Sequence, residues 1–510
     1  SAPDTASRIA NQLDHGSNRV AFAYDPNSNV TSRTNTHRSE LGGTNQSFVT
    51  THAYDGLGRL LQTVDNAGNT NRAAYDSRGN VVLSTDARGN VVSNSFNRLS
   101  WLTSTVRFMT TTGDGGGATT NAITTQRAYD FNGRVTGMTD DNGHATSYEY
   151  DSLNRLTRTL YADATDINYT YDVHDNLLTW NDARGNLVTA TYDFDNRVIS
   201  NFIARGSTVL GTTREGYQYD GLSQLTRATN NNSVVTRQYS SLGQVLRETQ
   251  QVAGGPVRTI TLSYDAEGNL LSNAYPGGRT VNYTYNAIEL PQTLSDSNGT
   301  IATYSYFGPG RVERRDYGNG TRTSYTFDPL QRLTNLVASV IATGTNLDAR
   351  AFAWDATHNL TAHNDLTPGA QDSRSYNHDS AQRLIRSVIA GMGTNGYTLD
   401  GANNRLTVTG GTMAGNYTLN PASPPADYQM NQYTSTPFDT RTYNVNGNLT
   451  VASNVIGLRQ FAYDYANRLI GYSNSATGVT VSNKFDCFGR RIEKVSNGVT
   501  NRFYFAGWQE

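Results

Sequence analysis

The chain has 510 residues, of which 36% are hydrophobic and 16% are charged, and its formal net charge at pH 7 is −2. This balance favours neither nucleic acid nor an anionic membrane as a partner, and the composition is not that of a disordered polyelectrolyte. No apolar run reaches the length of a membrane span, and the single cysteine, Cys487, excludes an intrachain disulfide framework.

A repeat of 21 residues organises the chain. An aromatic residue, in most cases followed by Asp, recurs at this step at positions 54, 75 and 96, at 129, 150, 171 and 192, and at 264, 285, 306 and 327. A fixed period in this range indicates a repeat architecture. Length alone would predict three or four compact domains, but the repeat predicts one extended body over residues 1–510.

Each repeat unit carries two turn signals. Four residues after the aromatic stands Gly, Asn or Asp, where a turn opened by Asp needs a left-handed backbone, and Arg, Asn or Gln and then Leu or Val follow. A second Asp-to-Gly turn lies half a unit later, as in residues 65–69 and 182–186, so each unit is predicted to be two short antiparallel strands and two turns. The predicted structural turn residues include Tyr54, Asp55, Gly58, Arg59, Tyr129, Asp130, Gly133, Arg134, Tyr150, Asp151, Arg155, Tyr192, Asp193, Arg197, Tyr264, Asp265 and Gly268.

Taken in order, residues 1–23 are a lead-in, and regular repeats run over residues 24–390. Insertions interrupt them near residues 103–125, where the Gly cluster predicts a flexible loop; no Lys-Ser/Thr follows it, as a phosphate cradle would require. Residues 391–442 are irregular and contain Pro421, Pro424 and Pro425, which suggests a plug, a crossing loop or an exposed contact. The final repeats occupy residues 443–510.

The number of strands constrains the shape. Some 20 units give about 40 strands, which at about 4.8 Å spacing make a sheet ~190 Å wide. Open sheets seldom exceed about 10 strands without curling. The fold class is therefore predicted to be all-β: an antiparallel ribbon that spirals into a hollow shell or barrel-like cocoon, lined by Tyr, Arg, Asn and Thr.

Candidate chemistry is sparse. The Asp residues stand where turns open, so turn capping explains them better than catalysis. His358, His363 and His378 lack metal-ligand spacing, and residues 140–143 lack the alternate ligands of a calcium loop. Cys487 has no neighbouring His and acid motif that would activate it. No catalytic, cofactor or metal site is predicted, and the protein is predicted not to be an enzyme.

The Tyr-Asp-x-x-Gly-Arg-Leu units resemble the YD repeats of the Rhs family, shared with the shell proteins of bacterial Tc toxin complexes, with polymorphic toxins and with teneurins. The resemblance covers almost the whole chain; residues 430–434 and 443–449 resemble the late repeats of bacterial members, and residues 503–508 the lead into the family's core segment. It implies a hollow β cocoon around a C-terminal toxin polypeptide. Self-cleavage in the family needs a core segment with an Asp-Pro-x-Gly motif, which does not follow the last units here, so neither cleavage nor cargo is carried over.

Three functional hypotheses follow. The first is a non-enzymatic shell fragment of a secreted or cell-surface polymorphic toxin, with a polypeptide cargo or delivery-machinery proteins as partners. The second is a cell-surface adhesion or carbohydrate-binding module that holds glycans on its Tyr- and Arg-rich faces. The third, an enzyme, has the least support.

Overall fold

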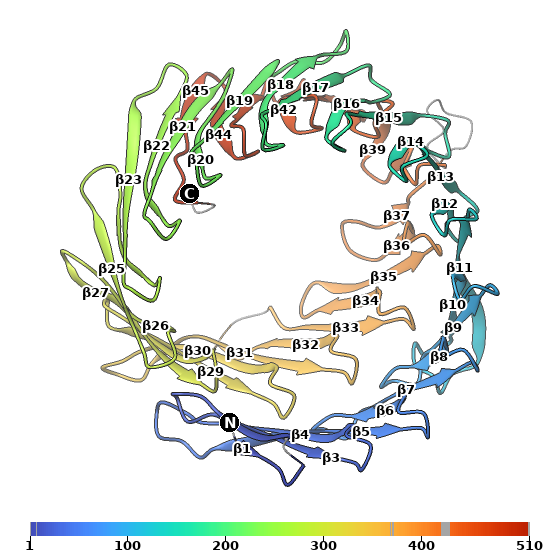
Figure 1. Cartoon of the computed structure of the whole chain (residues 1–510), viewed down its shortest axis with the longest axis vertical. Coiled ribbons are helices and arrows are strands. Elements are labelled where there is room, and N and C mark those ends of the chain that lie inside the picture. The colour runs from blue at the N-terminus through green and yellow to red at the C-terminus, as the bar shows by residue number, and fades with distance from the viewer. Residues whose placement is uncertain (1, 7, 368, 370–371, 420–428, 508–510) are drawn as a thin grey trace. The chain divides into compact units, whose positions relative to one another are not determined.

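The computed structural model describes residues 2–6, 8–367, 369, 372–419 and 429–507. Over these residues the elements are strands and turns with no helix, and consecutive strands pair antiparallel within two sheets, of 37 and 8 strands (Figure 1). The predicted all-β class and the antiparallel repeat ribbon are confirmed. In this part of the chain, accordingly, no helix has the length and hydropathy that a transmembrane span requires. The prolines at 421, 424 and 425 lie outside the described residues.

The chain divides into two compact units. Unit 1 contains residues 1–126, 280–403 and 407–414, and unit 2 contains residues 127–279, 404–406 and 415–510. The predicted single body over residues 1–510, with its internal boundaries, stays a prediction.

The chain passes through each unit twice, so each unit has a first layer and a second layer of ribbon. The first layer of unit 1 comprises β1 (Ala2–Pro3), β2 (Ile9–Leu13), β3 (Arg19–Tyr24), β4 (Val30–His37), β5 (Gln46–Tyr54), β6 (Leu60–Val64), β7 (Thr70–Tyr75), β8 (Val81–Thr85), β9 (Val91–Phe96), β10 (Leu102–Thr110) and the start of β11 (Thr119–Tyr129). Its second layer comprises β25 (Thr280–Tyr285), β26 (Pro291–Asp296), β27 (Gly299–Phe307), β28 (Arg311–Tyr317), β29 (Thr321–Phe327), β30 (Leu333–Val340), β31 (Asn346–Trp354), β32 (Leu360–Asp365), β33 (Arg374–His378), β34 (Leu384–Ile389), β35 (Gly393–Leu399) and part of β36 (Arg405–Thr409).

Unit 2 has the same plan. Its first layer comprises β12 (Val135–Thr139), β13 (Ala145–Tyr150), β14 (Leu156–Leu160), β15 (Asp166–Tyr171), β16 (Leu177–Asn181), β17 (Leu187–Tyr192), β18 (Val198–Ala204), β19 (Arg214–Tyr219), β20 (Leu225–Asn230), β21 (Ser233–Tyr239), β22 (Val245–Val252), β23 (Val257–Tyr264) and β24 (Leu270–Ala274). Its second layer comprises β37 (Gly415–Asn416), β38 (Ser435–Thr436), β39 (Asp439–Tyr443), β40 (Leu449–Ser453), β41 (Leu458–Tyr463), β42 (Leu469–Asn474), β43 (Thr480–Phe485), β44 (Arg491–Ser496) and β45 (Val499–Arg502).

Two kinds of turn alternate along every layer. We call the turn that follows the aromatic residue the YD turn and the turn half a unit later the second turn. In the β13–β14 hairpin, Asn154 donates its backbone N–H to the Asp151 carbonyl and has a φ of 67°, and the register shifts by one residue at Tyr150. A type I turn followed by a left-handed residue and a bulge produces this geometry. The predicted left-handed position is confirmed in unit after unit: Gly58, Gly79, Gly133, Asn154, Asp175, Asn196, Gly243, Gly268, Gly310, Gly447 and Gly489 all have positive φ.

The insertion near residues 103–125 forms two long paired strands, β10 and β11, joined by a tip at residues 111–118. Its glycines serve close packing. A Cβ on Gly113 would lie 2.4 Å from the His378 carbonyl oxygen, and the Thr110 backbone N–H donates to Ser380 Oγ at 3.0 Å. The Gly-rich tip is therefore docked on the second layer of unit 1, and the interpretation of it as a free flexible loop is wrong.

Two small clusters of buried hydrophobic side chains lie in unit 2. In unit 2, one cluster joins Val188, Ile203 and Val209 of the first layer to Tyr465 of the second layer, with Trp180 packed against it. A second cluster consists of Val252, Ile492 and Phe505. These clusters lie where the two layers of unit 2 meet, and β17 to β21 (green) and β42 to β45 (red) lie side by side in Figure 1.

Candidate functional site

A side-chain latch recurs on many of the YD turns. Asp151 Oδ1 accepts the backbone N–H groups of Leu153 and Arg155 at 2.9 and 3.0 Å, and Arg155 Nε donates to Asp151 Oδ2 at 2.7 Å. The hydrogen bond from the Arg155 backbone, followed by that from its side chain, lowers the pKa of the Asp151 carboxyl. Asp therefore closes its own turn as a carboxylate, which is why the motif places Arg four residues after it.

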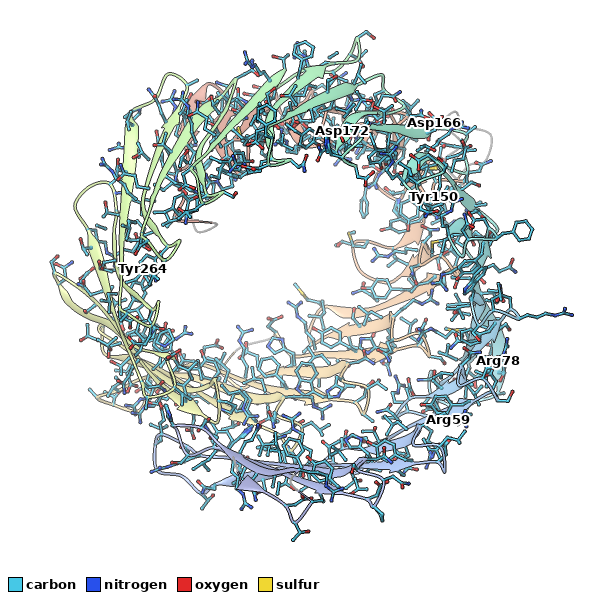
Figure 2. The ribbon with its side chains drawn as sticks, in the orientation of Figure 1. Arg59, Arg78, Tyr150, Asp166, Asp172 and Tyr264 are labelled. Carbon is cyan, nitrogen blue, oxygen red and sulfur yellow. The ribbon has the colours of Figure 1, made fainter. Side chains whose placement is uncertain are left out.

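The same arginine ties each unit to the next. Arg155 Nη1 donates to the Asp172 carbonyl at 2.8 Å and to Asp175 Oδ1 at 2.9 Å, and its guanidinium lies 4.9 Å from the centre of the Tyr171 ring. The Tyr171 hydroxyl in turn donates to the Leu156 carbonyl at 2.9 Å. We call this set of contacts the repeat latch. Figure 2 shows its side chains along the ribbon, with Tyr150 and Asp172 labelled on units of the first layer.

The structure places the predicted turn residues in such latches. Arg59 and Asp55, Arg134 and Asp130, and Arg197 and Asp193 form the same Nε to Oδ2 bonds at 2.6 to 2.7 Å. Their guanidiniums lie 4.8 Å from the rings of the next aromatic residues, Tyr75, Tyr150 and Tyr219. The hydroxyls of Tyr54, Tyr150 and Tyr192 donate to the carbonyls of Val30, Val135 and Leu177. Asp265 uses Asn269 in place of Arg, Tyr264 is part-buried at the end of β23, and Gly58, Gly133 and Gly268 supply the left-handed residue.

Residues 1–23, the expected lead-in, already contain a latch. Arg8 Nε donates to Asp4 Oδ2 at 2.7 Å, Arg8 Nη1 donates to the Asp25 carbonyl at 3.0 Å, and the guanidinium lies 4.5 Å from the Tyr24 ring centre. Sequence reasoning missed this unit because Pro3 stands where the aromatic residue belongs. The spacing of four residues from Asp4 to Arg8 was the available signal.

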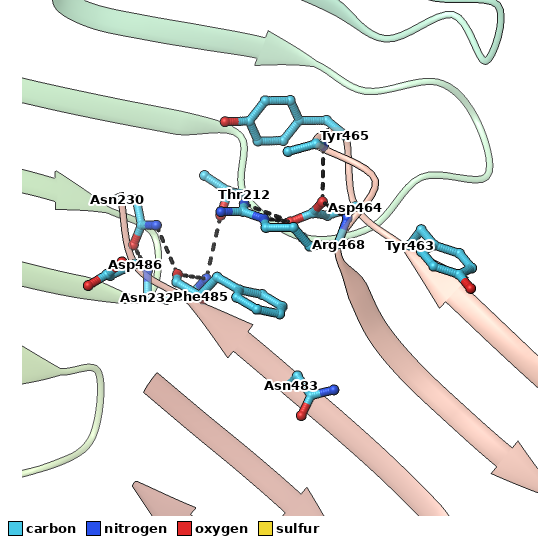
Figure 3. Close-up of polar contacts among 12 residues, drawn as sticks. Thr212, Asn230, Asn232, Tyr463, Asp464, Tyr465, Arg468, Asn483, Phe485 and Asp486 are labelled. Atoms are coloured by element: carbon cyan, nitrogen blue, oxygen red, sulfur yellow. Dashed lines mark hydrogen bonds and ion pairs between the residues drawn. The ribbon is translucent and has the colours of Figure 1, made fainter. Parts of the chain in front are cut away.

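A second kind of site is the contact between layers, which we call the layer seam. In unit 2 it joins second turns of the first layer to YD turns of the second layer. Arg184 donates to the carbonyls of Tyr463 and Asp464, both at 3.3 Å. Asn230 donates to the Phe485 carbonyl at 3.0 Å (Figure 3). The partners are 242 to 291 residues apart in sequence. The seam therefore determines which turns of the first layer lie against which turns of the second layer within the unit.

Three buried acidic groups stabilise this seam. Glu215 accepts hydrogen bonds from the hydroxyl groups of Tyr465 at 2.7 Å and of Tyr217 at 3.0 Å. Arg490, which is 4% exposed, bridges Asp486 at 2.7 Å and Glu248 at 3.2 Å. Burial, and then the Glu215 charge, raises the pKa of both tyrosine hydroxyls, so they stay protonated donors.

Unit 1 has a seam of different composition. Arg311 Nη2 contacts His37 Nδ1 at 2.9 Å, and its guanidinium lies within 5.2 Å of the ring centres of Phe48, Phe307 and Phe327. Burial, and then the Arg311 charge, lowers the pKa of His37 to about 4, so the imidazole is neutral near pH 7 and can accept from the guanidinium.

Sequence reasoning did not identify the seam residues. Glu215 and Glu248 lie on strands β19 and β22, whereas most acids of this chain open turns, and that departure was the only local signal. Cys487 lies beside Glu215, where burial and then the Glu215 carboxylate raise the pKa of its thiol to about 12. The thiol is therefore protonated near neutral pH and is a poor nucleophile.

Within the described residues, no group of three or more His, Cys, Asp or Glu side chains could hold a metal ion. The carboxylates of the latch are held by N–H donors of their own turns, and those of the seams by arginines, hydroxyls and amides. These hydrogen bonds and ion pairs hold each unit of the ribbon to the next unit and each layer to the other layer.

The comparisons with known proteins agree with this architecture. The family model described as RHS Repeat matches residues 129–166, which contain the latch of Arg134 and the turn-closing bond between Arg155 and Asp151. Residues 129–166 therefore match an RHS repeat, and the resemblance to YD repeats drawn from the sequence is confirmed there. No curated protein matches the chain.

Three solved structures share the fold. One is the Photorhabdus luminescens Tc holotoxin pore with a mutated TccC3, with a TM-score of 0.71 and 15% identity over 95% of this chain and 31% of that chain. The TcdB2-TccC3-Cdc42 crystal structure matches with a TM-score of 0.72 and 15% identity over 97% and 31%, and TcdB2-TccC3 without its hypervariable C-terminal region with 0.70 and 14% over 95% and 32%. The chain thus spans about a third of the length of these chains, and the likeness concerns the fold.

Proposed function

We propose that this protein is a non-enzymatic wall segment of an RHS-repeat toxin component, secreted or at a cell surface, whose ribbon encloses a polypeptide cargo. The observation that carries the proposal is the combination of latch and seam. The latch joins successive units through backbone carbonyls, and the seam joins successive layers through buried ion pairs. The polar groups of the turns therefore bond to one another and hold the wall together. Such an arrangement suits a barrier, and the fold shared with Tc toxin structures supports the same assignment.

The alternative of a glycan-binding adhesion module has less support, because the latch already uses the features that would bind sugars. The rings of Tyr150, Tyr171 and Tyr219 lie under arginine guanidiniums, and their hydroxyls donate to backbone carbonyls. The tyrosine rings of these latches are therefore not open platforms for sugar stacking.

Small-angle scattering of the purified chain tests the shell proposal. A solid globule of 510 residues has a radius of gyration of about 24 Å. A wall around an internal space is expected to give a clearly larger radius and a pair-distance distribution skewed towards long distances. A radius near that of a solid globule contradicts the proposal.

Cargo enclosure is tested separately with a small reporter domain fused after Glu510. Enclosure predicts that added protease leaves the reporter polypeptide intact while the wall is folded. The fusion carrying Arg490→Ala, which breaks the buried ion pairs of the unit 2 seam, should lose that protection, and the fusion carrying Arg155→Ala should keep it. Equal digestion of the reporter in all three proteins would show that the wall encloses nothing.

A further inference from the structure

The two edges of each ribbon layer differ in chemistry, and one of them is left apolar and exposed. Every layer has one edge made of YD turns and one made of second turns. In unit 2 the second-turn edge of the first layer contacts the YD-turn edge of the second layer, and this contact is the seam. In the part of the chain that the structure describes, apolar side chains on the YD-turn edge of the first layer and on the second-turn edge of the second layer remain exposed.

The same turn position is buried in the seam and exposed on the free edge. Tyr465, the first residue after Asp464, is 8% exposed and packs on Val188, Ile203 and Val209. The apolar side chains one or two residues after the turn-opening residue on the first layer are 63% to 108% exposed. They are Phe131, Leu153, Val173, Phe194, Leu222 and Leu242.

A single exposed leucine or phenylalanine is ordinary, but six at equivalent positions along one edge form a row. Consecutive YD turns are two strands apart, which places an apolar side chain about every 10 Å along this edge. A partner that covers the row must offer a complementary surface at the same spacing. A second-turn edge of the same ribbon has that spacing, because it alternates with the YD turns strand for strand.

The chain itself carries such an edge uncovered. The second turns of the second layer in unit 2 expose Val455 (104%), Ile456 (75%) and Val499 (64%). Unit 2 therefore exposes one edge of each kind that a seam requires: a YD-turn edge on its first layer and a second-turn edge on its second layer. Because the halves differ, a contact between them is heterologous and leaves one of each kind free after every addition.

We propose that the free YD-turn edge of unit 2 docks the free second-turn edge of a second copy of this chain, in a repetition of the seam already present inside the unit. The product is an open head-to-tail assembly. This inference concerns an outer edge of the ribbon and holds whether or not the protein encloses a cargo.

Sedimentation velocity across a concentration series tests the proposal. The wild-type chain, of 55.7 kDa, is expected to show a weight-average mass that rises with protein concentration. The variant Phe131→Ser/Phe194→Ser/Leu222→Ser on one edge, and the variant Val455→Ser/Ile456→Ser/Val499→Ser on the other, are each expected to stay monomeric. Phe202→Ser is the control, because Phe202 is 59% exposed on strand β18 and belongs to neither edge.

Mixing the two edge variants gives the decisive result. Each variant keeps one intact edge of the opposite kind, so an equimolar mixture should form dimers and nothing larger. Circular dichroism and thermal midpoints close to wild type establish that both variants are folded, and the turn-opening Asp residues are unchanged in each. A wild-type chain that stays monomeric at about 100 μM, a mixture that stays monomeric, or a Phe202→Ser variant that also loses association overturns the proposal.

Discussion

The buried arginines Arg311 of the unit 1 seam and Arg490 of the unit 2 seam have different partners. In unit 1, Arg311 makes no ion pair with any described carboxylate and lies instead among the rings of Phe48, Phe307 and Phe327, with His37 as its neutral acceptor. In unit 2, Arg490 is held by two carboxylates, Asp486 and Glu248, at 2.7 and 3.2 Å. Both guanidiniums lie over aromatic rings, Arg490 over Phe488 and Phe505 at 4.9 and 5.1 Å, but only Arg490 also has carboxylate partners. Unit 1 has its interlayer ion pair elsewhere, between Arg88 and Asp355 at 3.2 Å.

The difference shows that the repeat determines the turns but not the layer contacts. Both seams contain YD turns of the same geometry, with a left-handed residue at Gln331 (φ 67°) in unit 1 and at Gly489 (φ 78°) in unit 2. The side chains that those turns bury follow no repeat, because each seam meets a different surface of the first layer. Substitutions in the seams should therefore affect the two units by different amounts and with different pH dependence.

The largest effect is expected from Arg490→Ala. Removing this guanidinium leaves the buried carboxylate of Asp486 without its ion-pair partner and takes one of two arginines from Glu248, the other being Arg237 at 2.7 Å. Breaking a buried ion pair in this way costs about 3 to 5 kcal/mol. Chemical denaturation followed by circular dichroism measures the loss of unfolding free energy.

Arg155→Ala is the matched control for this substitution. Its ion pair with Asp151 has the same 2.7 Å distance, but both side chains are about a fifth exposed and the pair is screened by solvent, so the expected loss is much smaller. Arg490→Met separates charge from packing, since it keeps most of the volume and should still be strongly destabilised. Equal losses for Arg490→Ala and Arg155→Ala would contradict the importance of the seam.

The unit 1 seam should weaken in mild acid. Burial, and then Arg311, lowers the pKa of His37 to about 4, against about 6.5 in the unfolded chain. The unfolded state therefore binds a proton between these values and the folded state does not, so stability is complete above pH ~6.5 and falls as the pH drops towards 4. The difference corresponds to roughly 3 kcal/mol, because each pKa unit is worth about 1.4 kcal/mol.

His37→Gln tests this pH dependence, because glutamine can still accept from Arg311 but does not titrate. Between pH 6.5 and 4 the unfolding free energy of the variant is expected to change less than that of the wild type. His378, whose pKa is also lowered by burial, is present in both proteins and contributes equally to each. Parallel pH profiles for the two proteins would show that His37 is not the group responsible.

The sequence alone was sufficient to predict the features that depend on neighbouring residues, which are the turns and the latches. The YD turn needs an Asp, a left-handed residue and a donor within five positions, so its geometry could be predicted, and positive φ at Asn154 and Asp175 shows that the non-glycine cases were predicted as well. The latch from Arg155 to Asp172 spans one repeat, and the same periodicity carries it along the chain.

The seams could not be predicted in this way, because their partners are 242 to 291 residues apart in unit 2 and lie on different passes of the ribbon. No repeat period connects Glu215 with Tyr465, and the pairing depends on how the ribbon curves through the unit. The docked Gly-rich tip at residues 111–118 has the same cause. In the sequence alone, the glycines predicted a flexible loop. The contact with the second layer shows instead that Gly113 allows the tip to approach the His378 backbone closely.

The smallest of the expected effects concerns the hydroxyl that Tyr465 donates to Glu215. Tyr465→Phe removes one of the donors that hold this buried carboxylate, and no cation in the described chain lies within ion-pair distance of it, so the expected loss is about 2 kcal/mol. Tyr171→Phe removes a hydroxyl bonded to a neutral carbonyl and should cost about 1 kcal/mol. In a double-mutant cycle with Glu215→Gln, the loss at Tyr465 should shrink, because the acceptor no longer carries charge. An unchanged loss would mean that the Tyr465 ring, packed on Val188 and Ile203, stabilises the seam and that its hydroxyl does not.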